Sequence, residues 1–303
     1  MFPGKHEEKD NDDNDLMPRA YFELLRPPNL TTAAADVLAG YAAAGLGNPA
    51  ALGWLLAGTS CLYGGGVTLN DFFDRKLDAI ERPERPIPSG RVRPVAAAWL
   101  GGTLLMVGVI TAWQATAAAG LLASAIAGLS VLYDAWGKHR AVVGPANMGM
   151  CRALNLLLGV AAAPAALAGR WHLALVPFTY ISAVTALSRG EVHGGKRRIA
   201  LFSLISLVFV LAGLLLLTLR PGHSSLTGCA LTLLLAARVM PPFWRAYGDS
   251  SPGTIRTAVK TGVLSLVIVD AVVGATYGGP LYGLLVLATA VLAGGLARVF
   301  AVT

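Results

Sequence analysis

The amino-acid sequence predicts an all-α, polytopic transmembrane helix bundle. Of its 303 residues, 55% are hydrophobic and 14% are charged, whereas a soluble domain carries about 25% charged residues. Ten apolar runs of roughly 20 residues follow one another, and each is long enough to cross about 30 Å of hydrocarbon. Together these observations exclude an ordinary soluble protein.

The expected spans cover residues 28–46, 50–72, 95–115, 118–135, 143–166, 172–189, 199–219, 225–246, 257–276 and 280–300. Residues 1–17 are rich in carboxylates, and such a composition predicts an acidic disordered tail. The tail has no apolar core, so it is not a signal peptide. Residues 18–303 are therefore expected to form a single membrane-embedded domain.

The 24 Lys and Arg residues fall almost entirely on alternate loops. Only Arg170 and Arg220 lie on the opposite side, and Arg152 lies inside a span. By the positive-inside rule, both termini and the loop after the second span face the cytoplasm, and a bacterial inner membrane is the expected location. The net charge of +7 is thus a topology signal that also attracts anionic lipid or diphosphate. It does not indicate nucleic-acid binding. The three single cysteines, without C-x-x-C spacing, indicate neither a disulfide framework nor a zinc site.

Four polar residues, Asn70, Asp71, Asp74 and Asp78, follow the second apolar run. On a continuing helix they occupy one arc, at about 0°, 100°, 40° and 80°. Carboxylates crowded on one face repel one another unless positive charge lies between them. Mg²⁺ suits this position, because it prefers oxygen ligands and often joins carboxylates to a phosphate. The alternative is a solvated acidic end of a helix.

The loop that follows contains Pro83, Pro86, Pro88 and Pro94, which make it stiff. Two of its arginines, Arg82 and Arg85, are expected to reach either the acidic face or a diphosphate bound there. At the end of the fourth span, Tyr133 precedes Lys138 by five residues. A lysine in this position either extends to the interface or binds a ligand.

Ionisable residues also occur inside the spans. Asp36 in the first span fits either a functional site or a hydrogen bond between helices. Arg152 in the fifth span must face a cavity, a carboxylate or an anionic ligand, and Asn155 lies on the same face. Asp270 in the ninth span is expected to pair with a neighbouring helix. The sixth span ends in S-R-G-E-V-H-G-G, where His193 is at most a weak metal or proton-transfer candidate.

The motif N-D-x-x-D-x-x-x-D, followed by R-P-x-R-P-I-P-S-G, resembles the UbiA superfamily of intramembrane prenyltransferases. Tyr133 and Lys138 are similar to the Y-x-x-x-x-K element of that family. The resemblance covers residues 20–276 and nine helices, so the tenth is an addition. The second carboxylate motif of the family is depleted: Ser188 and Gly195 stand where two acids belong, and Glu191 remains. This variant resembles the EboC-like branch, which is linked to handling or export of biosynthetic precursors.

The resemblance implies an Mg²⁺-dependent transfer of a prenyl group from an isoprenyl diphosphate to a lipophilic or aromatic acceptor. The residues implied as metal ligands are Asn70, Asp71, Asp74 and, for a weakened second site, Glu191. Asp78 would orient a loop arginine, while the substrate would be bound by Arg82, Arg85, Tyr133, Lys138, Arg152, Asn155 and Arg197. The alternatives are a carrier or exporter of a prenylated precursor and an unrelated transporter. Acceptor, prenyl chain length and oligomeric state are left open.

Overall fold

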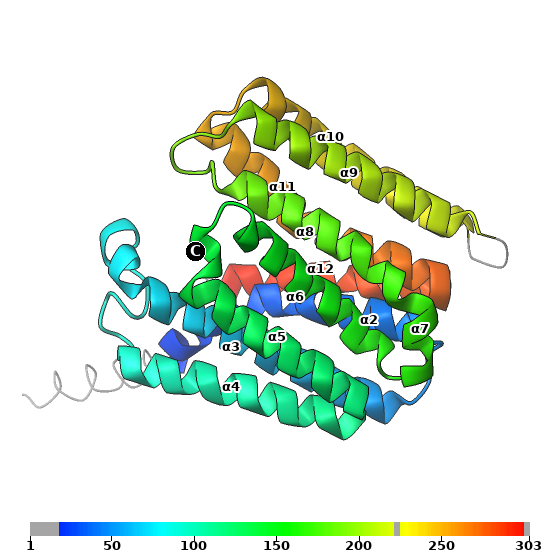
Figure 1. Cartoon of the computed structure of the whole chain (residues 1–303), viewed down its shortest axis with the longest axis horizontal. Helices are drawn as coiled ribbons and strands as arrows, with labels where there is room; N and C mark the ends of the chain where they lie inside the picture. The colour runs from blue at the N-terminus through cyan, green and yellow to red at the C-terminus, as the bar shows by residue number, and fades with distance from the viewer. Residues whose placement is uncertain (1–17, 221–224, 300–303) are drawn as a thin grey trace, which may run out of the picture.

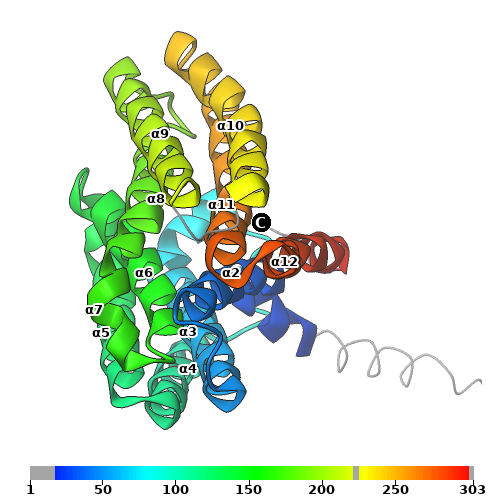
Figure 2. The same cartoon turned by 90° about the vertical axis from the view of Figure 1, so that its right-hand side faces the viewer.

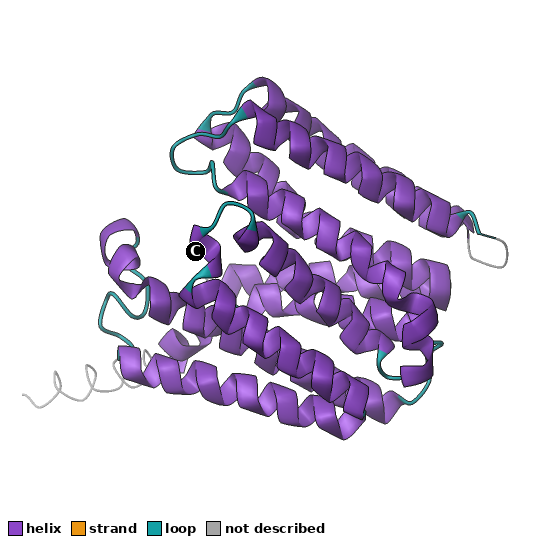
Figure 3. Cartoon of the chain, viewed as in Figure 1, coloured by secondary structure: helices purple, strands orange, loops and turns teal. Residues whose placement is uncertain are grey.

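The computed structural model describes residues 18–220 and 225–299. Within these residues the chain is helical, with turns between the helices and no strand (Figure 3). A helix over residues 18–25 leads into the bundle. The main helices are α2 (Pro27–Ala43), α3 (Pro49–Glu81), α4 (Pro94–Ala115), α5 (Ala117–Ala135), α6 (Val143–Val160), α8 (Leu175–Ser188), α9 (Arg197–Thr218), α10 (Ser225–Gly248), α11 (Pro252–Gly278) and α12 (Pro280–Val299). The prediction of an all-α bundle is confirmed.

These ten helices correspond to the ten expected spans, and the boundaries differ most in α3, in α6 and in α11, which begins at Pro252 instead of residue 257. α3 continues nine residues beyond the predicted end at residue 72 and stops at Glu81. No proline interrupts it before Pro83, and a residue that precedes proline disfavours helix. The predicted fifth span is too long, because α6 ends at Val160. Short turns and the four-residue α7 (Leu167–Arg170) fill the connection to α8. The predicted acidic tail lies outside the described residues.

The bundle buries its centre and exposes apolar side chains around it. α11 is buried along most of its length, and α2 packs against α3, α6, α11 and α12. Large apolar side chains face outward on other helices, including Trp99, Phe209 and Leu233. Within the described chain, seven helices are long and apolar enough to cross a membrane. The protein is therefore an integral, multi-pass membrane protein.

α2 and α6 approach each other closely at two glycines. A Cβ atom on Gly40 would collide with the backbone oxygen of Leu156, and one on Gly159 would collide with that of Val37. Small residues let membrane helices pack at this short distance. The contact brings Asp36 of α2 against Arg152 of α6.

The loops rich in basic residues gather at one end of the bundle, the left-hand end in Figure 1. There Arg26 reaches Asp71, Lys138 reaches Asp74, and the Arg189 guanidinium donates to the backbone oxygen of Lys138. Arg170 lies at the opposite end, where it donates to Ala43 at the end of α2. Figure 2 views the bundle from that opposite end. The separation of charge agrees with the predicted alternation of loops, while the assignment of the basic end to the cytoplasm stays a prediction.

Asp249 closes the turn between α10 and α11 by accepting hydrogen bonds from Ser251 and Thr254. These bonds lower the pKa of Asp249 below its ordinary value. A lowered folded-state pKa stabilises the fold above the unfolded-state pKa, and the effect is lost as pH falls through the folded-state pKa. Asp249→Ala should therefore lower the free energy of unfolding at pH 7, and the difference should shrink in acid. Unfolding followed at several pH values checks this; a difference that grows in acid contradicts it.

Candidate functional site

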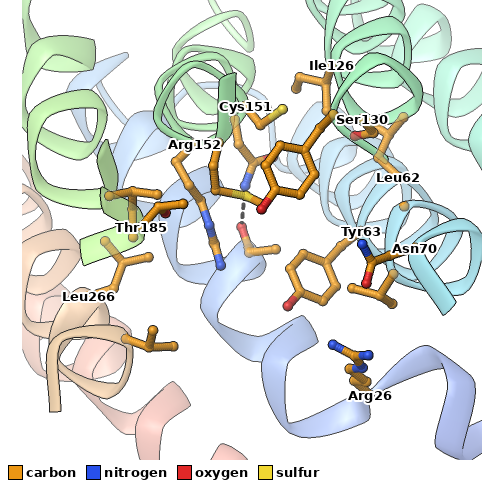
Figure 4. Close-up of a pocket in the computed structure, with 18 of the residues that line it drawn as sticks. Arg26, Leu62, Tyr63, Asn70, Ile126, Ser130, Cys151, Arg152, Thr185 and Leu266 are labelled. Atoms are coloured by element: carbon orange, nitrogen blue, oxygen red, sulfur yellow. Dashed lines mark hydrogen bonds between the residues drawn. The ribbon is translucent and has the colours of Figure 1, made fainter. Parts of the chain in front are cut away.

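A cavity of about 390 Å³ opens between α2, α3, α5, α6, α8 and α11. Its walls are mainly apolar, with Leu62, Ile126 and Leu266 among them, and a few polar groups point inward. Figure 4 shows Arg26, Tyr63 and Arg152 along this cavity, contributed by the segment before α2, by α3 and by α6. Apolar walls with a few placed polar groups are typical of a small-molecule site.

The carboxylates on α3 lie at the basic end of the bundle, beside the cavity. The buried Asp71 carboxylate accepts from Arg26, and one of its oxygens also lies 3.4 Å from Arg85. The same Arg85 guanidinium lies 2.8 Å from Asp78. Arg85, although it comes from a loop, is 5% exposed. It therefore neutralises two buried carboxylates and ties the loop to α3.

Arg26 reaches Asp71 from an unusual backbone position. It is a non-glycine residue in the left-handed region, with φ of 48°, at the break between the first helix and Pro27 of α2. Such a conformation is uncommon for side chains other than Asn, Asp or His. The break lets Arg26 line the cavity and contact α3 at the same time.

Two more polar pairs complete this end of the cavity. The Lys138 ammonium donates to Asp74 over 2.6 Å. The Asn70 amide donates to Asp134 of α5 over 2.9 Å. Asn70, Tyr133 and Asp134 all line the cavity. The motif on α3 and the end of α5 thus form one polar group at this end of the cavity. We call it the rim, and it consists of Arg26, Asn70, Asp71, Asp74, Asp134 and Lys138.

A second polar cluster lies deeper, on α2 and α6. The Arg152 guanidinium donates to Asp36 and to Thr32, each over 2.8 Å. The Asn155 amide donates to the same Asp36 oxygen over 2.9 Å and accepts from Thr59 of α3 over 2.7 Å. Arg152 and Asn155 line the cavity. We call Asp36, Arg152 and Asn155, together with Asp270, the floor cluster.

Helix geometry separates the rim from the floor cluster. Asp36 follows Arg26 by ten positions, which correspond to about 15 Å at 1.5 Å per residue. Asp71 follows Thr59 by twelve positions of α3, or about 18 Å. The two helices thus give similar depths independently. A diphosphate held at the rim would therefore lie well away from Asp36, and the predicted contact of Arg152 with diphosphate oxygens stays a prediction.

Of the predicted site residues, Asn70, Tyr133, Arg152 and Asn155 line the cavity, and the others lie outside its lining. Glu191 is half-buried near Arg82 and Arg256, and burial raises its pKa although both guanidinium groups lower it. Arg82 and Arg197 are exposed, and Arg197 stacks on Tyr247 and donates to its hydroxyl. Glu191, Arg82 and Arg197 are not among the described residues that line the cavity. Their roles in binding stay predictions without support from this geometry. His193 is also exposed.

The donor set at the rim fits Mg²⁺ only in part. Asn70, Asp71 and Asp74 offer oxygen ligands on successive turns of α3, and Arg26 and Lys138 show that positive charge is bound there. Across residues 18–220 and 225–299, however, no three His, Cys, Asp or Glu side chains meet as a metal-binding group. Mg²⁺ commonly uses one or two carboxylates and completes its shell with substrate phosphates and water. The residues present fit that mode of binding.

Arg26 and Asp134 are site residues that were not predicted from the sequence. A usable signal existed for Asp134, since it directly follows Tyr133 and precedes Lys138 by one helical turn. Arg26 had no comparable signal, because its role depends on the break before Pro27. Cys151, for which no site role was predicted, also lines the cavity.

The chain matches the UbiA prenyltransferase family over residues 30–261. Because this match covers most of the sequence, the protein belongs to that family. The prediction of the superfamily is confirmed, and the EboC-like branch stays a prediction.

Relatives with this similarity include archaeal enzymes. A digeranylgeranylglyceryl phosphate synthase from Methanothrix thermoacetophila is 29% identical over 211 residues, which are 64% of this chain and 75% of the relative. The synthase from Methanopyrus kandleri is 45% identical over 93 residues, which are 30% of this chain and 34% of the relative. The chain thus spans only about a third of some of the curated relatives it matches.

Solved structures agree with the fold. One, from work on digeranylgeranylglyceryl phosphate synthase in membranes, has a TM-score of 0.67 at 18% identity and covers 85% of this chain and 97% of that one. A UbiA homologue from Archaeoglobus fulgidus bound to GPP and Mg²⁺ has a TM-score of 0.54 at 15% identity, covering 84% and 99%. The apo UbiA homologue from Aeropyrum pernix K1 has a TM-score of 0.60 at 14% identity, covering 79% and 96%.

Proposed function

We propose that the protein is an intramembrane prenyltransferase that binds an isoprenyl diphosphate through Mg²⁺ at the rim. It transfers the prenyl group to a lipophilic or aromatic acceptor in the cavity. The observation that carries this proposal is the pairing of Asp71 with Arg26 and of Asp74 with Lys138, beside an apolar cavity that Arg26 and Asn70 line. The family and the synthases similar to this chain support the same reaction class.

The residues divide the work by position. Asn70, Asp71 and Asp74 would hold Mg²⁺, which supplies positive charge against the diphosphate as it leaves. Lys138 and Arg26, whose cationic groups already lie on these carboxylates, would turn to the diphosphate oxygens. Charge-assisted hydrogen bonds of this kind are short and strong.

The cavity below the rim suits the prenyl group and its acceptor. Its apolar wall keeps water from an allylic cation, while Tyr63 and Tyr133 provide aromatic faces beside it. Aromatic faces attract cations through their quadrupole. Asp78 does not line the cavity but accepts a hydrogen bond from Arg85. This contact supports its predicted role in orienting a loop arginine.

A carrier that binds a prenylated precursor without turnover is the second candidate. It is favoured by one observation: Glu191, the acid that remains in the depleted second motif, lies near Arg256 and Arg82. A site with one intact carboxylate motif binds a second Mg²⁺ weakly. We also propose that the rim faces the cytoplasm. The bacterial inner membrane stays a prediction, since the relatives described above are archaeal.

The two candidates differ in product formation. The full chain in lipid nanodiscs is incubated with geranylgeranyl diphosphate, Mg²⁺ and an extract of membrane lipids, and both released diphosphate and prenylated lipid are measured. Mg²⁺-dependent release matched by prenylated product supports the transferase. Saturable binding of the diphosphate without either product supports the carrier and rejects the transferase.

Lys138→Gln should weaken the use of prenyl diphosphate by about 10- to 100-fold in kcat/KM, because a hydrogen bond to a charged group contributes about 1.5–3 kcal/mol. Arg140→Gln is the matched control, since Arg140 is exposed and stacks on Trp136. Equal kinetics for the Lys138 variant and the wild type would exclude Lys138 from the diphosphate site.

A further inference from the structure

The floor cluster contains more carboxyl groups than its single cation can neutralise. Asp36 and Asp270 are each 0% exposed. The Asp270 carboxyl neighbours that of Asp36, and the charges acting on it are those of Asp36 and Arg152. Two ionised carboxylates with one guanidinium would leave a net charge of −1 in the centre of a membrane bundle. Burying such a charge is costly.

The hydrogen bonds within the cluster are also incomplete. One Asp36 oxygen accepts from Arg152 and Asn155. Within the described part of the chain, the other Asp36 oxygen and both Asp270 oxygens have no donor. Buried polar atoms rarely lack partners. A single proton shared by the two carboxyls would join the second Asp36 oxygen to one Asp270 oxygen, and one of the three oxygens without a donor would remain.

The same proton makes the cluster neutral, and this matters for what Arg152 can bind. A guanidinium has five N–H groups, and the hydrogen bonds seen among the described residues use two of them, to Asp36 and Thr32. The Arg152 side chain lines the cavity and lies 5.6 Å from the Tyr63 ring centre. In front of a cluster with net charge −1, an anion would be repelled. In front of a neutral cluster, the remaining N–H groups favour a carboxylate or phosphate, which match the planar fork of arginine.

We propose that the floor cluster is an oxyanion-binding site, kept neutral by one proton that Asp36 and Asp270 share. It takes the carboxylate or phosphate of the acceptor, about 15 Å from the rim along α2. That the bound group belongs to the prenyl acceptor rests on the proposed function. The anion-binding site and the shared proton do not depend on it. Asp270 is a positioning residue, because it acts on Arg152 through Asp36.

The shared proton has a spectroscopic signature. Difference infrared spectra of the full chain in nanodiscs are recorded for the wild type, Asp270→Asn and Thr276→Ala. The wild type should show a C=O stretch of a protonated carboxyl that is absent from the Asp270 variant. Thr276, buried on the same helix and bonded only to the backbone of Val272, is the matched control and should keep the band. Identical carboxyl bands in the wild type and Asp270→Asn would overturn the proposal.

Anion binding is measured separately, without Mg²⁺ or prenyl diphosphate, by the thermal stability of the nanodisc-bound protein. Dodecyl phosphate and dodecanoate distinguish phosphate from carboxylate, and dodecanol is the neutral probe. At least one anion should raise the Tm more than dodecanol does. Asp270→Asn should keep this rise, because its amide is neutral and donates to Asp36.

The double variant Asp36→Asn with Arg152→Gln removes both charges of the ion pair, so that no buried charge is left unpaired. It should lose the anion-dependent rise in Tm. An undiminished rise in the double variant, or an equal rise with dodecanol, would overturn the oxyanion site. Because no prenyl diphosphate is present, this result is independent of whether the protein transfers prenyl groups.

Discussion

Replacing Asp71 and Asp74 together by Asn is expected to reduce Mg²⁺-dependent diphosphate release by about 1,000-fold or more. Loss of one preorganised group that stabilises developing charge costs about 100- to 1,000-fold, and this change removes both carboxylates that would carry Mg²⁺. Both side chains retain their size, so the packing of α3 is preserved. Release of diphosphate from geranylgeranyl diphosphate by the purified variant provides the measurement.

The matched control for this change is Glu81→Gln with Glu84→Gln. It removes two negative charges from the same segment, and both side chains are exposed. The control should keep wild-type rates. Comparable losses in the two double variants would show that the overall charge of the segment, rather than the positions of Asp71 and Asp74, determines activity.

Arg85→Met is expected to lower the free energy of unfolding by about 3–5 kcal/mol, the usual cost of breaking a buried ion pair on one side. The guanidinium is 5% exposed and neutralises Asp78 and, with Arg26, Asp71. Without it, the Asp78 carboxylate is buried with no cation. Reversible unfolding in mixed micelles measures the change.

Arg82→Met serves as the control, because Arg82 comes three residues earlier in the same loop and is exposed. Its effect should stay within about 0.5 kcal/mol, as is usual for surface substitutions. Adding Asp78→Asn to Arg85→Met should recover part of the loss, since no ionised carboxylate is then left unpaired at that position. If Arg85→Met is as stable as Arg82→Met, the ion pairs do not hold the loop.

The fold was largely predictable from the sequence, because each span had to supply its own apolar length. All ten expected spans correspond to helices. The errors occurred where polar residues continue a helix beyond the membrane, as from Phe73 to Glu81, and where Pro164 ends α6 early. The length of an apolar run predicts neither the polar continuation of α3 nor the early end of α6. The single-domain prediction for residues 18–303 and the acidic tail stay predictions.

The site was predictable only where its residues are adjacent in sequence. Asn70, Asp71, Asp74 and Asp78 share one helix, and their common face follows from the helical repeat. The pairs Arg26–Asp71 and Arg152–Asp36 join residues 45 and 116 positions apart. Only packing of the helices brings such residues together. A sequence pattern contains no measure of depth, so it could not show that Arg152 pairs with Asp36 and Thr32.

The central claim is that the α3 carboxylates at the rim bind a prenyl diphosphate through Mg²⁺. It is tested most directly by calorimetric titration of geranyl diphosphate into the nanodisc-bound protein, with and without Mg²⁺, for the wild type and for Asp71→Asn with Asp74→Asn. The account predicts binding to the wild type that is much tighter with Mg²⁺ and a variant that has lost this dependence. Equal affinity in the wild type with and without Mg²⁺, or unchanged Mg²⁺ dependence in the variant, would contradict it.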